Sequence, residues 1–382
     1  MDKKKPSAEA GIHLFKMLGF EVRMDWSWLF LALLVTWTLA VGYFPAQLPD
    51  LQASTYWLMG LLGTLGLFFS IILHELCHSL VGRAYGIPMD GITLFIFGGI
   101  AHMRDMPSSP KSEFLMAVVG PLFSLGLAAF FFSLIQIGEE LNWYQPLLAV
   151  ITYLAAVNLV VGMFNLLPGF PLDGGRVFRS ILWWWKGDLI WATNIACKGG
   201  VVLGYSLIIF GIMHFFLGAL ISGVWLFLLG FFIERLSRSS YEQVLIKQIF
   251  NNETIEKYAK TNPVTVTEPL TLAELMNNYF YRYYHKLYPV VQDDKLTGYI
   301  SLKEIKEINQ DNWRTITVGE VMQRCPSDIV IEADTTVIQA LQMMYAQNIS
   351  RMIVTKNGRL YGILTLKDMM NVVSIRMTLE QT

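Results

Sequence analysis

Six long apolar runs constrain the fold of this 382-residue chain more than any other feature. Each run is long enough to cross a bilayer. Because the bilayer core offers no water to unpaired backbone groups, such runs are expected to fold as helices. The chain is 54% hydrophobic and only 15% charged, which is typical of integral membrane proteins. The predicted spans centre on residues 28–43, 56–81, 113–137, 147–167, 195–214 and 217–233.

Lys and Arg residues are confined to alternate connections between these runs. They occur before the first run, after the second, fourth and sixth, and in none of the other connections. The positive-inside rule then places both termini in the cytoplasm. The first residues lack an apolar segment followed by a cleavage site, so no secretory signal is expected to be removed. A net charge of −1 gives no reason to expect a nucleic-acid partner.

The second run ends in His74-Glu75-Leu76-Cys77-His78. On a helix the two histidines lie one turn apart and about 40° apart around the axis, so they can bind one zinc ion. Glu75 projects about 80° to one side, where it can act as a general base on water at the metal. Ionisable side chains in a membrane segment are costly and mark functional sites. A chance match remains the alternative, and Cys77 is a further ligand candidate, although packing suits it better.

Residues 91–103 are rich in β-branched and aromatic residues and contain a glycine pair, which predicts a β-hairpin. Two interpretations stay open. Its edge adds a strand of substrate, or the segment is a passive re-entrant loop. His102 within it is another candidate ligand, although a polar role at the membrane interface is favoured.

Residues 165–176 interrupt the end of the fourth run with two prolines. Non-helical backbone at membrane depth is tolerated where it is buried in protein or lines a cavity. Gly174 and Gly175 are expected to let the chain turn so that Asp173 faces inward as a third zinc ligand. The alternative makes Asp173 the N-cap of a helix over residues 175–185.

Polar residues on the neighbouring runs extend this site. Asn165, beside the break, is predicted to donate a hydrogen bond to the scissile carbonyl or its oxyanion. Asn158, on the same face, is predicted to form an interhelical hydrogen bond. Gly120, Pro121 and Ser124 in the third run are interpreted as a close-packing notch against the second run, without a catalytic role.

These motifs together resemble the site-2 protease family of intramembrane zinc metalloproteases. The resemblance covers about residues 10–236 and rests on His74-Glu75-Leu76-Cys77-His78 with Asn165-x-x-Pro168-x-x-Pro171-Leu172-Asp173-Gly174-Gly175-Arg176. Phe97-Gly98-Gly99 and Gly120-Pro121 are similar to further family signatures. The resemblance implies one zinc ion per chain held by His74, His78 and Asp173, Glu75 as the base, and Asn165 as a substrate-positioning residue. It also implies regulated cleavage of single-span membrane proteins, and no insertion here is long enough for a PDZ domain.

The sequence after Arg238 has ordinary soluble character and contains an internal repeat. Residues 264–266 recur as 329–331, and residues 295–304 recur as 359–368, at offsets of 64 to 65 residues. Each copy predicts strand, helix, strand, strand, helix. The pair resembles tandem CBS domains, which pack as a pseudo-symmetric module and often bind adenosine nucleotides.

The CBS resemblance also implies where a nucleotide would bind. Gly362, Thr365 and Asp368 fit a G-x-x-[ST]-x-x-D stretch, with the hydroxyl on phosphate and the carboxylate on ribose. Ser301 is the equivalent hydroxyl of the first copy, where Glu304 replaces the aspartate. In the alternative, Asp368 only caps the following helix and the pair serves as a dimer interface.

We therefore predict a membrane α-helical domain of six transmembrane helices with a small membrane-associated β-hairpin, over residues 1–238. A linker helix over 239–252 leads to a cytoplasmic α+β tandem CBS module, with CBS domains at 253–310 and 311–382. The predicted function is an intramembrane zinc endopeptidase that cleaves transmembrane protein substrates in the lipid bilayer, under control of an adenosine nucleotide. The alternative is a CBS-gated transporter or channel, which has no need for Glu75 beside His74. A catalytically dead zinc scaffold leaves an intact Glu75 unexplained.

Overall fold

The computed structural model describes residues 12–95, 98–103, 107–293, 295–324 and 329–380. The chain divides between Val244 and Leu245 into two compact units. Both residues lie within helix α8, so the predicted linker over 239–252 falls largely in the last turns of that helix.

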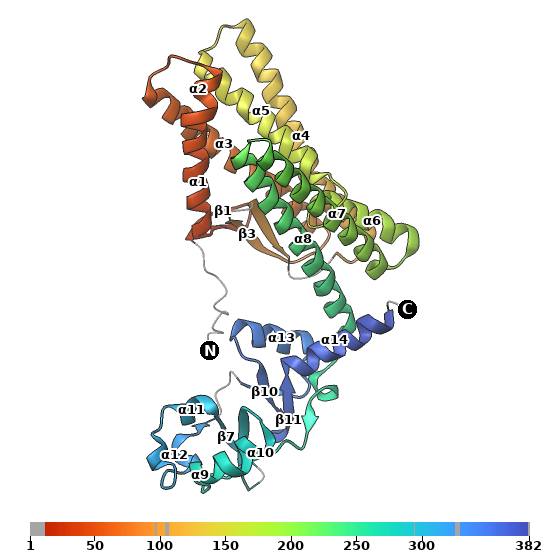
Figure 1. The fold of residues 1–382 in the computed structure, drawn as a ribbon. Coiled ribbons are helices and arrows are strands. Elements are labelled where there is room, and N and C mark those ends of the chain that lie inside the picture. Colours follow the sequence, from red (N-terminus) through yellow and green to blue (C-terminus); the bar gives the residue numbers. More distant parts are fainter. Residues whose placement is uncertain (1–11, 96–97, 104–106, 294, 325–328, 381–382) are drawn as a thin grey trace. The chain divides into compact units, whose positions relative to one another are not determined.

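Among its described residues, the first unit contains six helices that are long and apolar enough to cross a membrane (Figure 1). Each coincides with one predicted apolar run, and most extend beyond it. Large hydrophobic side chains remain exposed along them, as with Leu33, Ile209 and Ile221, which suits contact with lipid. The six are α1 (Trp26–Thr38) continuing through a π-helical turn (Leu39–Tyr43) into α2 (Phe44–Gln47), α3 (Ala53–Ala84), α4 (Pro110–Glu140), α5 (Gln145–Asn165), α7 (Leu189–Phe216) and α8 (Leu220–Ile249).

Helix α4 packs against α3, α5 and a shorter helix, α6 (Asp173–Lys186). Small and polar residues join these helices. The Asn158 amide of α5 donates to Ser70 Oγ of α3 at 3.1 Å and to its own helix at Leu154 O. The predicted interhelical role of Asn158 is therefore confirmed. Such bonds favour association where lipid offers no competing polar partner.

A four-stranded sheet lies against α3, with the order β1-β2-β3-β4. Its strands are β1 (Ile12–Met17), β2 (Phe20–Met24), β3 (Met89–Phe95) and β4 (Gly98–Met103). The β3–β4 pair is the predicted hairpin, and β2 joins β3 in parallel. The prediction of a hairpin alone was incomplete, because two N-terminal strands complete the sheet.

The N-terminal strands carry a signal that the sequence analysis missed. In β2, Phe20, Val22 and Met24 are buried and alternate with more exposed residues, which is the period of a half-buried strand. Val22 packs with Leu94 of β3 against Ile72 of α3. The sheet thus covers the side of α3 adjacent to the predicted metal motif.

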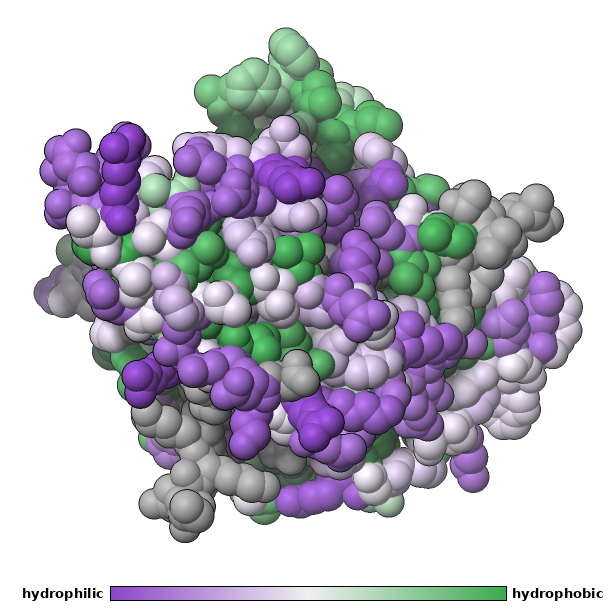
Figure 2. Space-filling view, turned by 90° about the horizontal axis from the view of Figure 1, so that it is seen from below, coloured by the Kyte–Doolittle hydropathy of each residue, from purple (hydrophilic) through white to green (hydrophobic). Residues whose placement is uncertain are grey.

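The second unit is built on a seven-stranded sheet in which β6-β7-β11-β10-β9 form a continuous path. Strand β5 pairs with β11, and β8 pairs with β7. The face shown in Figure 2 is mainly hydrophilic, as expected for a surface in water. The strands are β5 (Lys260–Thr261), β6 (Leu287–Gln292), β7 (Lys295–Ser301), β8 (Gln323–Arg324), β9 (Val330–Glu332), β10 (Arg351–Lys356) and β11 (Arg359–Thr365).

The predicted repeat order is confirmed in the second copy, as β9, α13, β10, β11 and α14. In the first copy the opening strand is reduced to a single bridge between Val266 and Val290. The helices of this unit are η2 (Ile255–Lys257), α9 (Leu272–Leu275), η3 (Met276–Phe280), α10 (Tyr281–Tyr283), α11 (Leu302–Lys306), η4 (Gln310–Asn312), α12 (Val318–Val321), α13 (Val337–Ala346) and α14 (Leu366–Glu380).

Candidate metal centre

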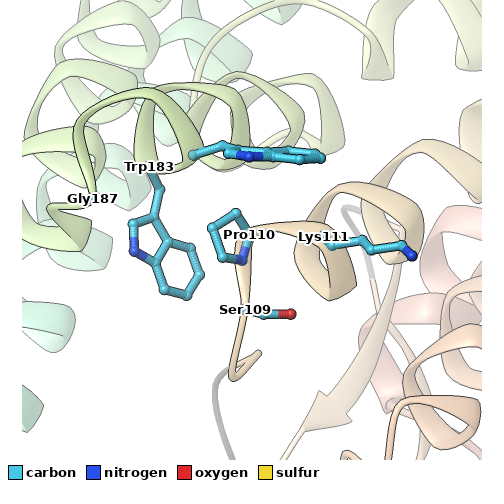
Figure 3. A pocket seen from close by; sticks show the side chains of 6 residues that line it. Ser109, Pro110, Lys111, Trp183 and Gly187 are labelled. Carbon is cyan, nitrogen blue, oxygen red and sulfur yellow. The ribbon is translucent and has the colours of Figure 1, made fainter.

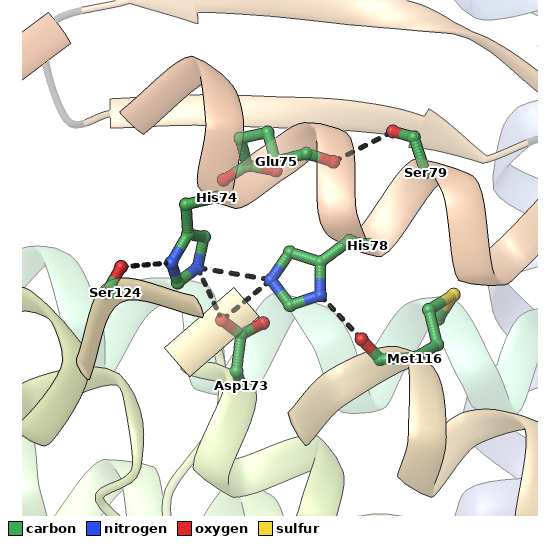
Figure 4. Close-up of polar contacts among 7 residues, drawn as sticks. All are labelled: His74, Glu75, His78, Ser79, Met116, Ser124 and Asp173. Carbon is green, nitrogen blue, oxygen red and sulfur yellow. Dashed lines mark hydrogen bonds and ion pairs between the residues drawn. The ribbon is translucent and has the colours of Figure 1, made fainter. Parts of the chain in front are cut away.

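The structure brings His74, His78 and Asp173 together. The two histidines lie one turn apart on α3 and are buried, while Asp173 is the first residue of α6. Their Nε2 atoms are 3.1 Å apart, and Asp173 Oδ2 lies 3.1 Å from His74 Nε2 and 3.0 Å from His78 Nε2. Figure 4 shows both imidazoles facing the carboxylate.

This donor set fits one zinc ion. Donor atoms about 2.0–2.2 Å from a tetrahedral zinc ion stand roughly 3.3–3.6 Å apart, close to the spacing seen here. Two imidazoles and one carboxylate are a donor set that catalytic zinc sites use. Within the described residues, Cys77 does not belong to the group of ligand atoms that converge here. The side chain of His102 falls outside the described part of the chain.

Helix α4 orients both histidines. His78 Nδ1 donates to the carbonyl oxygen of Met116 at 2.6 Å, and His74 Nδ1 lies 2.9 Å from Ser124 Oγ. Since a carbonyl only accepts, the neutral His78 ring carries its proton on Nδ1 and turns the lone pair of Nε2 toward the site. Ser124 was predicted only as part of a packing notch, and its contact with His74 is an additional role that the structure reveals.

Gly120 supplies the close approach of α4 to the two rings. A Cβ at this position would lie 2.2 Å from His78 Nε2 and 2.7 Å from His74 Nε2. The expected packing notch is therefore real, and it lies directly against the Nε2 atoms of both histidines. Only a residue without a side chain leaves both imidazoles in place.

The role expected for the glycine pair needs correction. Gly174 and Gly175 are helical residues of α6 instead of turn residues. A Cβ on Gly174 would lie 2.3 Å from the Leu166 carbonyl, and one on Gly175 would lie 2.4 Å from Gly169 C. The pair therefore lets α6 pack directly on the backbone of the broken segment.

The N-cap alternative for Asp173 is also wrong. The N-cap of α6 is Leu172, and it makes no side-chain capping bond. Asp173 occupies the first helical position, and its carboxylate points to the histidines instead. Its position at the start of the helix follows from the break that precedes it.

Glu75 and Asn165 both remain available for a reactant. Glu75 is half-buried on α3, and Asn165 is half-buried at the last residue of α5. Within the described residues, no hydrogen bond engages the Glu75 carboxylate or the Asn165 amide, although the Glu75 backbone carbonyl accepts from Ser79 Oγ at 3.0 Å. Both groups can therefore act on a molecule that enters the site.

A pocket of about 350 Å³ lies elsewhere in this unit, between the start of α4 and the end of α6 (Figure 3). None of the predicted site residues lines it. It is bordered by Ser109, Pro110, Lys111, Trp183, Trp184 and Gly187.

The predicted nucleotide residues of the second unit occupy equivalent places in the two repeats. Ser301 caps α11 and bonds Glu304 at 2.5 Å, as Thr365 bonds Asp368 at 2.6 Å at the start of α14. Lys260 Nζ lies 2.8 Å from the other oxygen of Asp368. Burial opposes ionisation, yet the bonds from Lys260 and Thr365 hold the pKa of Asp368 below its usual range.

Family comparisons agree with this geometry. The model of peptidase family M50 matches residues 62–145 and 133–207, and the CBS domain model matches residues 255–310 and 318–375. The chain is 31% identical over 368 residues to a Mycobacterium tuberculosis protein named zinc metalloprotease Rip3, covering 95% of this chain and 93% of the relative. This chain belongs to peptidase family M50, the site-2 proteases. The chain is thus a zinc metalloprotease and a multi-pass membrane protein with tandem CBS domains.

Two further similar proteins come from one archaeal organism. This chain is 30% identical over 366 residues to zinc metalloprotease MJ0392 of Methanocaldococcus jannaschii. The match covers 95% of this chain and 96% of MJ0392. A solved structure of a site-2 protease from the same organism covers 60% of this chain and 94% of its own, with 26% identity and a TM-score of 0.42.

Proposed function

We propose that this M50 protease cleaves transmembrane segments of membrane proteins within the bilayer, as an endopeptidase of regulated intramembrane proteolysis. The convergence of His74, His78 and Asp173 beside a half-buried Glu75, on a helix long enough to span the membrane, carries this proposal. The three converging residues would hold the zinc ion. An ion path for a transporter has no use for this donor set.

The residues divide the work of peptide hydrolysis. Zinc supplies Lewis-acid chemistry, since it lowers the pKa of water and polarises a carbonyl. Glu75 takes the proton from the attacking water and returns it to the leaving amine. Asn165 donates its amide N–H to the substrate carbonyl, whose developing negative charge it stabilises. Ser124 and the Met116 carbonyl keep the two imidazoles oriented throughout.

The same proposal includes a six-span topology with both termini in the cytoplasm. The distribution of Lys and Arg among the connections supports it. His74 and His78 lie toward the end of α3, so the metal centre would sit nearer the cytoplasmic face. We keep the membrane domain at residues 1–238, the linker at 239–252 and the CBS domains at 253–310 and 311–382 as part of this assignment.

Strand β4 is the proposed docking edge for substrate. A transmembrane helix must unwind before its amide is exposed, and an extended segment can then pair with a free strand edge. In the described sheet order β4 stands at one end, with β3 as its neighbour. A hairpin that merely lines the site is the alternative, and proline substitutions in β4 that leave cleavage unchanged would favour it.

Exchange of Glu75 for glutamine tests the function. Glu75→Gln should keep zinc and fold while cleavage of a co-expressed single-span substrate falls by a factor of at least ~100, because the general base is lost. Glu139→Gln, at the exposed far end of α4, is the matched control and should cleave normally. Retained cleavage in Glu75→Gln, or an ion flux through the purified protein, would move the assignment to the transporter alternative.

We further propose that the CBS pair binds an adenosine nucleotide at Thr365, Asp368 and Ser301 and so adjusts cleavage. The matched arrangement of the two repeats supports this, although Lys260 already engages the Asp368 carboxylate. Calorimetry with AMP, ADP and ATP on the full chain should show binding that Asp368→Ala weakens, and cleavage should follow the same rank order. Absence of binding to all three would leave the pair as a capped, dimer-forming module.

A further inference from the structure

One face of α4 contacts both histidines of the metal centre. Met116 accepts from His78, Gly120 packs against both histidines, and Ser124 lies against His74. Glu113, one turn before Met116, accepts a hydrogen bond from Arg179 of α6. These four positions fall within roughly 80° of one another around the helix. The face that orients the two histidines therefore also holds the helix that supplies Asp173.

The contact with α6 is a buried ion pair. Glu113 is 1% exposed and Arg179 is 6% exposed. Arg179 Nε donates to Glu113 Oε1 at 2.7 Å, and Arg179 Nη2 bonds the same oxygen. Arg179 follows Asp173 by six residues on the same helix, so the pair fixes α6 about 9 Å along its axis from the ligand.

Arg179 also holds the chain that leads into Asp173. Its guanidinium lies 4.7 Å from the centre of the Phe170 ring. The Phe170 backbone is tied on both sides, since its N–H donates to Ala196 O at 3.2 Å and its carbonyl accepts from Ser237 Oγ at 2.5 Å. Arg179 thus lies on the helix that follows Asp173, and its guanidinium contacts the segment that precedes Asp173.

The pair is not arranged for stability alone. Glu113 Oε2 is buried and has no hydrogen-bond partner within the described residues. A buried ion pair gains little over apolar packing unless its remaining oxygen is satisfied. The presence of the pair in this position is better explained by a requirement for defined geometry than by stabilisation.

We propose that the buried Glu113–Arg179 pair is a positioning element of the metal centre, which holds the start of α6 so that Asp173 Oδ2 meets the two histidine nitrogens. This inference rests on the proposed ligand set. Loss of Arg179 leaves Glu113 buried and unpaired and releases α6 from α4. Removal of such supporting contacts lowers metal affinity by about 10–100-fold in other zinc sites.

Zinc affinity of the purified full chain tests the inference. Chelator competition should show a 10–100-fold loss in Arg179→Gln, with part of the loss recovered in Arg179→Lys, which restores the charge. The absorption spectrum of the Co²⁺-substituted protein should change in Arg179→Gln in the same direction as in Asp173→Ala, because both lose the carboxylate ligand. Arg238→Gln is the matched control, since Arg238 pairs with Glu234 on α8 and is largely exposed; its affinity should match the parent.

The outcomes separate the inference from the ligand set. Full zinc affinity in Asp173→Ala would overturn the ligand set itself. Weak binding in Asp173→Ala with normal affinity and an unchanged Co²⁺ spectrum in Arg179→Gln would overturn the positioning role alone. A lower unfolding temperature of the metal-free Arg179→Gln protein, without a spectral change, would also overturn it. If Arg179→Gln fails to fold, Glu113→Gln is the second variant, because its amide oxygen still accepts from Arg179. It should give the same spectral change with a smaller loss of zinc affinity. A parental spectrum and parental affinity in Glu113→Gln would refute the proposal.

Discussion

Replacing Gly120 with alanine places a methyl group between the two histidines of the metal centre. The new Cβ would lie 2.2 Å from His78 Nε2, whereas ordinary van der Waals contact begins at 3.4 Å. Either the ring or α4 must therefore move by about 1.2 Å. Both imidazoles are held on α4 by Ser124 and Met116, so either movement strains these bonds. Overpacking of this kind costs about 1–3 kcal/mol of stability.

The displaced atom, His78 Nε2, is a proposed zinc ligand, so function should suffer more than stability. A misplacement of about 1 Å can lower a catalytic rate by roughly 100-fold. Gly120→Ala should therefore fold, carry clearly less than one zinc ion per chain, and cleave a co-expressed single-span substrate at least ~100-fold more slowly.

Gly126→Ala on the same helix is the matched control. Nothing lies within 4 Å of a Cβ at that position, so zinc content and cleavage should equal those of the parent protein. Metal analysis by mass spectrometry, thermal unfolding in detergent and the cleavage assay complete the comparison. A Gly120→Ala protein with full zinc and parental cleavage would refute the packing argument, and with it the position of α4 against the histidines.

Three further outcomes follow from individual contacts. Ser124→Ala should lower zinc affinity about 10–100-fold in chelator competition by freeing the His74 ring. Ser133→Ala is the control and should bind zinc as the parent does, since within the described residues its hydroxyl bonds Ala129 O of its own helix. Equal affinities in the two variants would remove Ser124 from the site. Asn158→Leu should lower the free energy of unfolding in detergent by about 1 kcal/mol and leave the zinc content unchanged. An unchanged free energy of unfolding would contradict this. The pKa of Asp368 is lowered from its usual value of 3.8 in the folded protein. The bonds of its carboxylate therefore stabilise the second unit at pH values above 3.8, and this stabilisation is lost as the pH falls through the lower pKa of the folded state. In urea unfolding, the free energies of unfolding of the parent and Asp368→Asn should accordingly differ at neutral pH and converge at acidic pH. A difference that stays constant with pH would contradict the assignment.

Much of the metal centre could be predicted from local sequence. His74 and His78 share a helix face because of the helical repeat alone, and two prolines before Asp173 require a break in a membrane helix. The apolar runs predicted all six long helices because a bilayer leaves few other structures open to such segments. The reasons given for Gly174 and Gly175 were wrong, since their role depends on which backbone packs against them.

Strands β1 and β2 show a second limit. Their alternation is short, and the parallel partner of β2 lies 70 residues further along the chain, as Gly91 does for Glu21 and Leu94 for Met24. Such a distant partner leaves no mark in the local pattern. Strand pairing at such distance depends on how the intervening helix α3 returns the chain, which only the folded structure reveals.

The sequence by itself determined the chemistry proposed for this protein: the types and spacing of the proposed zinc ligands, the proposed general base, the apolar helices and the repeated second unit. The tertiary structure alone decided how that chemistry is held in place. Ser124, the Met116 carbonyl and the Glu113–Arg179 pair all act on residues far away in the chain. The physical reason is that ligand identity is a property of single side chains and helical periodicity, whereas ligand orientation depends on contacts between helices that no local pattern records.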